Sequence, residues 1–285
     1  MLIHQLFAQK RPVVSFETFP PKPASPLESI FQCIEELQAL KPDFISVTYG
    51  AGGSTRGRTL EVARHIQHDH GIPALGHLTC VGATAATIQA ILHEFAAQGI
   101  ENILALRGDP PKDAPIPPTP YRAKDLIRFI RQQRRPCSIA AAAYPEGHLE
   151  SPSREDDLRF LKEKVDSGVD FLITQIFFDN AMLYRFLEDA RALGIDVPVM
   201  AGIMPVFSRP QVERICSLCG ATLPPALVKL MDKYGHQKEA MEQAGLEYAS
   251  RQIEDLLAHG IDGVHLYTMN RPHLARTLVR NTGLR

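Results

Sequence analysis

The sequence predicts an α/β fold, a (β/α)8 barrel with extra helices before its last strand. Apolar runs rich in β-branched residues recur along the 285 residues, and helical patterns separate them. The runs are apolar without a break, as expected for parallel strands covered on both faces. Eight strand-then-helix units in a chain of this length are typical of such a barrel. A doubly wound open sheet is the competing fold, but no composition shift or long linker marks a second domain. Residues 1–285 are therefore predicted to form a single barrel domain.

The elements follow one another in a regular order. The expected strands are short runs of Val, Ile, Leu, Phe and Ala at Val13–Thr18, Phe44–Tyr49, Ala74–Cys80, Asn102–Leu106, Ser138–Tyr144, Phe171–Phe177, Val197–Met204 and Gly263–Thr268. The expected helices are Leu27–Leu40, Thr59–His70, Thr84–Gln98, Ala123–Arg134, Glu155–Ser167 and Met182–Leu193. Gly71, Gly99, Gly168 and Gly194 each follow a helix, where a left-handed residue caps the C-terminus. The stretch 208–260 is helical in pattern and longer than one unit needs, so it is predicted to add a helix pair.

Composition limits the class of protein. Hydrophobic residues make up 45% of the chain and charged residues 22%, which is ordinary for a soluble globular protein. The formal net charge is −1 and no basic stripe with interleaved aromatic residues occurs, which argues against a nucleic-acid partner. No apolar stretch approaches the roughly 18 residues of a membrane span. The N-terminal residues place their charge after an apolar patch, the reverse of a signal peptide, and five scattered cysteines fit a reducing compartment. We therefore expect a cytoplasmic protein with no membrane partner.

Polar residues gather where the expected strands end. The C-terminal face of a (β/α)8 barrel carries the functional site. The residues at that face are Glu17, Thr48, His77, Thr79, Arg107, Asp109, Tyr144, Gln175, Pro205 and Tyr267. In LALRGDPP (104–111) an apolar run ends on a cation, a glycine and a carboxylate, which alone favours a surface turn. Because most of the other strands also end on a polar residue, the ring predicts a pocket that includes Asp109.

Segments at these strand ends resemble the methylenetetrahydrofolate reductase family. They are VSFETFPPK (14–22), ISVTYGAGGSTR (45–56), GHLTC (76–80), LALRGDPP (104–111), AAYPEGH (142–148), FLITQIFFD (171–179), AGIMPV (201–206) and HLYTMNR (265–271). They occur in the family's order and cover essentially the whole chain. The resemblance implies a barrel with bound FAD that reduces 5,10-methylenetetrahydrofolate to 5-methyltetrahydrofolate with NADH or NADPH, in two half-reactions, and that forms a homo-oligomer. The chain ends soon after the expected barrel, as in the bacterial type, which lacks the eukaryotic C-terminal regulatory domain.

Two carboxylates carry the chemistry that the resemblance implies. Glu17 stands among phenylalanines and prolines, and apolar walls would raise its pKa and keep a proton available. The family assigns the matching glutamate the role of general acid, which protonates the departing nitrogen when the imidazolidine ring of the substrate opens. The alternative is a surface pair with Lys22. Asp109 resembles the family's aspartate beside flavin and pterin, where its charge tunes the flavin and accepts hydrogen bonds from the pterin.

The resemblance also implies the binding residues. The FAD contacts are Thr48, His77, Arg107, Gly108, Asp109, Tyr144, His148, Asp157 and Lys164, with Arg107 and Lys164 toward the diphosphate. The folate contacts are Glu17, Asp109, Gln175, Gln211, Tyr267 and Arg271. Phe160 and Glu163 stand where bacterial members often have Asn and Arg, and Ile215 stands where an aromatic residue is common. Glu163 would repel a diphosphate if it pointed inward.

Three other hypotheses of function stay open at this point. The departures at Phe160 and Glu163 are compatible with a reductase without bound flavin, in which hydride passes directly from nicotinamide to folate. A second hypothesis is a pterin-binding barrel that transfers a methyl group to a corrinoid protein without redox chemistry. A third is a non-catalytic subunit that binds folate or a partner.

Further motifs favour structural explanations. GAGGST (50–55) lacks the third glycine and the acidic strand end of a dinucleotide fingerprint, so a barrel loop is predicted. HIQHDH (65–70) carries three histidines at the expected end of a helix, and a helix terminus is favoured over a metal site. Cys216 and Cys219 have no partner pair and are predicted to pack in the core. No metal site is predicted.

Overall fold

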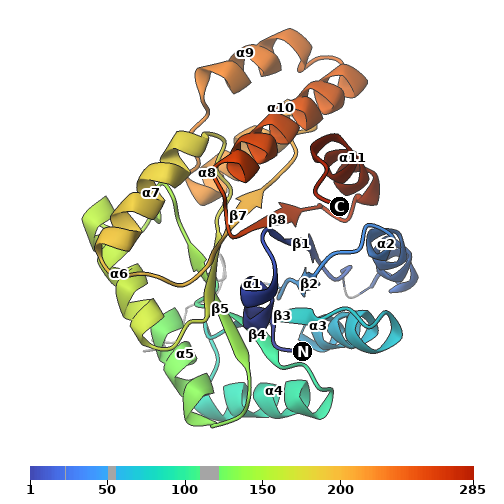
Figure 1. The fold of residues 1–285 in the computed structure, drawn as a ribbon. Coiled ribbons are helices and arrows are strands. Elements are labelled where there is room, and N and C mark those ends of the chain that lie inside the picture. The colour runs from blue at the N-terminus through green and yellow to red at the C-terminus, as the bar shows by residue number, and fades with distance from the viewer. Residues whose placement is uncertain (23, 51–55, 110–121) are drawn as a thin grey trace.

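The computed structural model describes residues 1–22, 24–50, 56–109 and 122–285. Within these residues, eight parallel strands close into a barrel in chain order, as Figure 1 shows. The strands are β1 (Val13–Thr18), β2 (Phe44–Val47), β3 (Ala74–Thr79), β4 (Asn102–Leu106), β5 (Ser138–Ala143), β6 (Phe171–Thr174), β7 (Val199–Ile203) and β8 (Gly263–Tyr267). β1 pairs with both β2 and β8, which completes the ring. The predicted fold class is confirmed.

Helices surround the barrel on its outside (Figure 1). They are α2 (Glu28–Gln38), α3 (Arg56–Arg64), α4 (Ala85–Ala97), α5 (Ala123–Gln132), α6 (Arg154–Asp166), α7 (Asn180–Ala192), α8 (Arg209–Cys219), α9 (Pro225–Tyr234), α10 (Lys238–Ala258) and α11 (Pro272–Thr282). α9 and α10 are the predicted extra helices before β8. Gly71, Gly99, Gly168 and Gly194 all have positive φ, between 65° and 112°, as their expected capping role requires.

Two strands end more than one residue earlier than expected. β2 stops at Val47 rather than Tyr49, and β6 stops at Thr174 rather than Phe177. In β6 the reason is a local hydrogen bond, because the Ile176 backbone N–H donates to the Gln175 side chain instead of to a neighbouring strand. An apolar run in the sequence therefore continues past the end of the strand, into the buried start of the following loop.

The N-terminal residues fill the bottom of the barrel, which the sequence did not predict. A single 3-10 turn, η1 (Ile3–Gln5), leads into the short helix α1 (Leu6–Gln9). Ile3, Leu6 and Phe7 pack against the lower layer of the barrel interior, which is formed by Val13, Phe44, Leu75, Leu104, Ala140, Phe171, Ile173 and Met200. The Ile3 backbone N–H donates to the Asn102 side chain at 2.9 Å. In Figure 1, α1 accordingly lies within the ring of strands.

The position of this lower layer determines which residues face the interior higher up. Side chains alternate along a strand, so every second residue after Val13, Phe44 and Leu75 faces the same interior. Counting by two places Glu17 and Thr48 at the upper, C-terminal end of the barrel. The intervening residues pack outward against the helices in the larger hydrophobic core. The bottom of the barrel is therefore closed by apolar packing, and its top carries the polar strand ends.

No helix in the described parts of the chain is both long enough and apolar enough to cross a bilayer.

Candidate functional site

Glu17 lies at the top of the barrel between two histidines. It is the fifth residue of β1 and pairs in register with Tyr267 of β8 and Ser46 of β2. Its Oε2 lies 3.7 Å from His77 Nε2 and 3.6 Å from His265 Nε2. The Glu17 side chain retains 19% of its exposure. The sequence suggested apolar walls or a pair with Lys22, whereas the structure surrounds this carboxylate with two imidazoles.

His77 is buried and neutral. It is 5% exposed, and its Nε2 has no hydrogen-bond partner in the structure. Burial lowers the pKa of His77 to about 4, outweighing the nearby Glu17 carboxylate, which raises it. A neutral imidazole with an open nitrogen can donate to or accept from a ligand placed above the barrel. His77 is therefore suited to contact a bound molecule, as its predicted role in FAD binding requires.

His265 and Ser15 belong to the same cluster, and sequence reasoning missed both. Ser15 Oγ and His265 Nδ1 are 2.7 Å apart, and the opposite nitrogen of His265 faces Glu17. Both residues are buried, at 0% and 1% exposed. The sequence does contain a signal for both residues. Ser15 lies two positions before Glu17, and His265 lies two positions before Tyr267. Residues two apart on a strand share one face of the sheet.

Tyr267 holds the neighbouring part of the rim. Its hydroxyl donates to the Thr174 carbonyl at 2.8 Å, and burial raises its pKa well above the usual value. The ring meets His265 edge-on with centroids 5.0 Å apart. Gly202 leaves room for this ring, because a Cβ there would lie 2.7 Å from Tyr267 and 2.3 Å from the Thr174 carbonyl oxygen. The predicted substrate contact therefore also packs the rim of β6, β7 and β8.

A cavity of about 360 Å³ opens at the C-terminal ends of β4 and β5. Its size lies within the range of small-molecule sites. Five of the predicted FAD contacts line it, and they come from different segments of the chain: Arg107, Tyr144, His148, Asp157 and Lys164. Arg122, Glu150 and Phe160 also line it. The structure thus brings together most of the residues expected at the diphosphate and flavin.

Lys164 is a half-buried cation of this cavity. Its Nζ donates to the Ala142 carbonyl at 2.6 Å and lies 5.9 Å from the centre of the Tyr144 ring. Burial lowers the pKa of Lys164 to about 8, and nearby Asp157 opposes that effect. Asp157 is itself buried and accepts a hydrogen bond from Ser151 at 2.7 Å. An anionic ligand placed here would hold Lys164 in its charged form.

Tyr144 forms the wall between cavity and barrel. Its ring meets His148 edge-on at 4.7 Å, and burial raises its pKa to about 12. Next to it, Arg107 makes a bidentate pair with Glu150, with Nη2 2.9 Å from Oε1. This pair lowers the pKa of Glu150. Arg107 therefore reaches the cavity already paired, and a diphosphate would compete with Glu150 for it.

Gly108 could not be replaced by a larger residue without movement. Its φ is +85°, and a Cβ would lie 2.8 Å from Thr79 Cβ and from Val81 Cγ1. In LALRGDPP (104–111) the glycine therefore turns the chain where it passes close to Thr79 and Val81 at the end of β3. The following residue, Asp109, is exposed at the same rim. Its charge contributes to the raised pKa values of Arg107 and Tyr144, which places it near both.

Two of the three departures from the family pattern, Glu163 and Phe160, are accommodated in different ways. Glu163 points to α5, where Lys124 Nζ lies 2.7 Å from its Oε2 and lowers its pKa. Phe160 lines the cavity, and the guanidinium carbons of Arg122 and Arg159 lie 5.6 and 5.4 Å from its ring centre. Glu163 is thus neutralised by Lys124, and Arg122 brings a cation to the cavity wall.

The remaining predicted folate contacts do not line this cavity. The side-chain Oε1 of Gln175 accepts a hydrogen bond from the backbone N–H of Ile176, the next residue in the chain. Gln211 accepts the Phe207 N–H at 3.0 Å, and Arg271 lies 4.0 Å from the centre of the Phe207 ring. Thr48, one of the predicted FAD contacts, follows β2 and does not line the cavity either. Its backbone N–H donates to the Thr18 carbonyl oxygen. Gln175 and Thr48 belong to the rim, whereas Gln211 and Arg271 hold the loop after β7.

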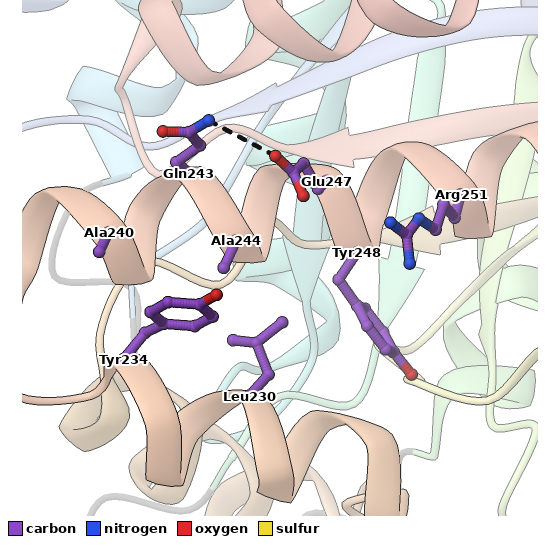
Figure 2. A pocket seen from close by; sticks show the side chains of 8 residues that line it. All are labelled: Leu230, Tyr234, Ala240, Gln243, Ala244, Glu247, Tyr248 and Arg251. Atoms are coloured by element: carbon purple, nitrogen blue, oxygen red, sulfur yellow. Dashed lines mark hydrogen bonds between the residues drawn. The ribbon is translucent and has the colours of Figure 1, made fainter.

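A second cavity of about 280 Å³ lies apart from the strand ends. It is a groove between α9 and α10, lined by Leu230, Tyr234, Ala240, Gln243, Ala244, Glu247, Tyr248 and Arg251, as Figure 2 shows. Figure 2 marks one hydrogen bond between these lining residues, in which Gln243 Nε2 donates to Glu247 Oε1 at 3.5 Å. None of the predicted site residues lies in it. Cys216 and Cys219 pack nearby in α8 against the cluster that covers β7, as expected.

Within the described residues, no group of three or more His, Cys, Asp or Glu side chains is arranged to hold a metal ion. GAGGST falls largely on residues 51–55, which lie outside the described residues.

Comparison with known proteins gives consistent matches over the whole chain. The family profile described as Methylenetetrahydrofolate reductase matches residues 2–283. The chain is 35% identical to the 5,10-methylenetetrahydrofolate reductase of Pectobacterium carotovorum, over 97% of this chain and 92% of that protein. It is 34% identical to the enzyme of the same name from Escherichia coli, over 95% and 91%.

Plant relatives and solved structures extend the comparison. The chain is 35% identical to Methylenetetrahydrofolate reductase (NADH) 1 of Arabidopsis thaliana over 99% of its own length, and spans about half the length of that relative, 50%. A solved structure titled as an uncharacterised protein from Clostridium thermocellum that binds two copies of 5-methyl-5,6,7,8-tetrahydrofolic acid superposes with a TM-score of 0.68. It is 14% identical and covers 99% of both chains, and this likeness shows the shared fold.

Proposed function

Because the chain belongs to the methylenetetrahydrofolate reductase family, we propose that it reduces 5,10-methylenetetrahydrofolate to 5-methyltetrahydrofolate, with FAD bound and NADH or NADPH as reductant. The observation that carries the proposal is the position of Glu17. Its carboxylate stands at the top of the barrel between two imidazoles, at the same end of the barrel as a cavity lined by three cationic side chains, Arg107, Arg122 and Lys164. A general acid and an anion-binding cavity at one end of the barrel are what this reaction requires.

The residues present fit a flavin dinucleotide. The buried Nε2 of His77 lacks a partner and can bond a polar edge of the ring system. The cations that line the cavity, Arg107, Arg122 and Lys164, can bind a diphosphate. Tyr144 offers an aromatic face between cavity and barrel. When bound, FAD would accept hydride from the nicotinamide and supply it to the folate.

Glu17 and its neighbours handle the proton. We propose that the carboxylic acid form of Glu17 donates a proton to the departing nitrogen of the imidazolidine ring, which opens the ring for reduction. His265, bonded to Ser15, faces the same carboxylate oxygen and is placed to return a proton to it. Asp109 at the rim would accept hydrogen bonds from the pterin, strengthened by its charge. Gln175 uses its amide oxygen within its own loop, so its amide nitrogen remains to donate.

The experiment is to observe the two half-reactions separately. We expect purified protein to be yellow, to lose its flavin absorbance on anaerobic mixing with NADH or NADPH, and to regain it when methylenetetrahydrofolate is added. Acid precipitation should release all the flavin as intact FAD, because no covalent attachment is expected. Release of FMN instead would contradict the diphosphate roles of Arg107 and Lys164.

Other outcomes would select the rival functions. Protein that takes up no FAD yet reduces methylenetetrahydrofolate with NADH would establish direct hydride transfer. Methyl transfer to a corrinoid protein without nicotinamide oxidation would establish the methyltransferase. Folate binding with neither activity would leave a binding subunit.

We further propose that residues 1–285 act as one catalytic domain, that the protein is cytoplasmic and that it forms a homo-oligomer. Light scattering during gel filtration measures the last of these.

A further inference from the structure

The end of α3 departs from ordinary helical geometry and brings two histidines together. α3 continues into a π-helical turn, η3 (His65–Asp69), and His70 follows it directly. The wider π-helical turn favours contact between residues five apart, and such turns are frequent at functional sites. Here His65 Nε2 and His70 Nε2 lie 3.1 Å apart, with ring centroids 4.7 Å apart. Phe31 of α2 packs on the His65 ring at 4.0 Å.

The opposite nitrogens of the two rings are already used. His65 Nδ1 lies 2.6 Å from Asp69 Oδ2, and a carboxylate oxygen only accepts, so Nδ1 carries the hydrogen. His70 Nδ1 lies 2.5 Å from Gln38 Oε1, and the amide oxygen also only accepts. In the neutral rings, both Nε2 atoms are then acceptors that face each other at hydrogen-bonding distance. Such a pair requires a cation, either an added proton or a metal ion.

The geometry favours a metal ion. Zinc bonds imidazole nitrogen at about 2.0–2.1 Å, so two ligands at a tetrahedral angle stand about 3.3 Å apart, close to the observed separation. The Nδ1 bonds of His65 to a carboxylate and of His70 to a carbonyl oxygen are the outer contacts that metal-binding histidines commonly make. We propose that His65 and His70 form a binding site for one divalent transition-metal ion of the zinc class, with water completing its coordination.

The surroundings are consistent with this choice. The two imidazoles come from one chain segment, but Gln38 and Phe31 belong to α2. The ion would therefore fix the contact between α2 and the end of α3. This contact lies just before β3, at the N-terminal face of the barrel, which is opposite to the candidate site. Residues at that face of a (β/α)8 barrel serve stability rather than catalysis.

The test uses untagged protein from which metal has been removed with a chelator. ZnCl2 is the probe in calorimetry and in thermal unfolding, and CuSO4 is the probe in electron paramagnetic resonance. We expect one equivalent of Zn²⁺ to bind and raise the unfolding temperature, and Cu²⁺ to show coupling to imidazole nitrogen. His65→Ala and His70→Ala should each lose the binding. Gln38→Leu, at an exposed position, should weaken it about 10–100-fold, because it frees the His70 ring.

His68→Ala is the matched control. His68 lies in the same turn, but its Nε2 contacts the Gln98 carbonyl at 2.9 Å, away from the pair. This variant should keep full Zn²⁺ affinity. Circular dichroism and unfolding without metal would show whether each variant is folded. The proposal is overturned if wild-type protein takes up no Zn²⁺, if His70→Ala binds as well as wild type while folded, or if His68→Ala loses as much affinity as His70→Ala.

Discussion

At the scale of single residues, the proposed chemistry depends on Glu17, and Glu17→Gln separates binding from proton donation. The amide keeps the shape of the acid but has no proton to give. Reduction of the flavin by NADH involves no departing nitrogen, so we expect its rate to stay within a few-fold of wild type. Reduction of the folate should slow by about 10²–10⁴-fold, the usual contribution of a general acid. Stopped-flow absorbance measures both steps in one preparation. Equal loss of both would mean that Glu17 supports the pocket instead.

Asp109→Asn tests the other carboxylate. Removing the charge should raise the reduction potential of the bound flavin, so its reduction by NADH should hold or improve. Folate should bind more weakly and accept hydride more slowly, because hydrogen bonds to a neutral amide are weaker. Spectroelectrochemical titration and folate binding measure the two effects. If neither changes, Asp109 belongs to a surface turn, as the isolated motif suggested.

At the scale of elements, the adjacent strands β1 and β8 carry Ser15, Glu17 and His265, which we propose handle the proton. Ser15→Ala removes the hydroxyl that fixes His265 Nδ1 at 2.7 Å. We expect the rate of folate reduction to fall and its pH profile to shift, because His265 is free to change tautomer in front of Glu17. Reduction by NADH should be unaffected. Ser15→Thr, which keeps the hydroxyl, is the matched variant and should restore the wild-type pH profile. A uniform loss at every pH would indicate only damaged packing.

The turn after β4 tests the rim of the cavity. Gly108→Ala meets both an unfavourable positive φ, about 1–2 kcal/mol, and an overpacked neighbour, about 1–3 kcal/mol, because the new Cβ would approach Thr79 and Val81 at 2.8 Å. Gly82→Ala is the control, since its φ is +69° but nothing lies within 4 Å of a Cβ there. We expect Gly108→Ala to be the less stable of the two in chemical unfolding and to retain less FAD. Equal stability would show that the turn gives way easily.

The elements also show what the sequence could and could not reveal. Every strand could be located because continuous apolar runs report burial on both faces. The strand ends indicated residues of the upper rim such as Glu17 and Tyr267, but not Ser15 and His265, which lie two positions earlier on the same face of their strands. The pairing of Glu150 with Arg107 and of Lys124 with Glu163 joins segments about 40 residues apart, which no local pattern reports. The contact of His65 with His70 depends on a π-helical turn rather than an α-helical one.

At the scale of the whole molecule, the stability of the barrel should depend on pH through His77. Its pKa is about 4 in the folded protein and near 6.5 when unfolded, so the unfolded state binds the proton more readily. The resulting stabilisation is fully present above pH 6.5 and is lost as the pH falls toward 4. The difference of about 2.5 units corresponds to about 3 kcal/mol.

Other groups also titrate in this range, so the expected result concerns a difference between two proteins. Asp69 and Glu150 have lowered pKa values and contribute to acid unfolding in both. His77→Gln keeps a polar group near the position of Nε2 but cannot gain a proton. The variant should lose less stability than wild type between pH 6.5 and 4.5 in urea unfolding, and the two curves should run parallel above pH 7. If the curves stay parallel down to pH 4.5, the imidazole gains its proton in the folded barrel at about the same pH as in the unfolded chain. Its proton would then be shared with Glu17, and the acid that opens the folate ring would be the pair rather than the carboxyl group alone.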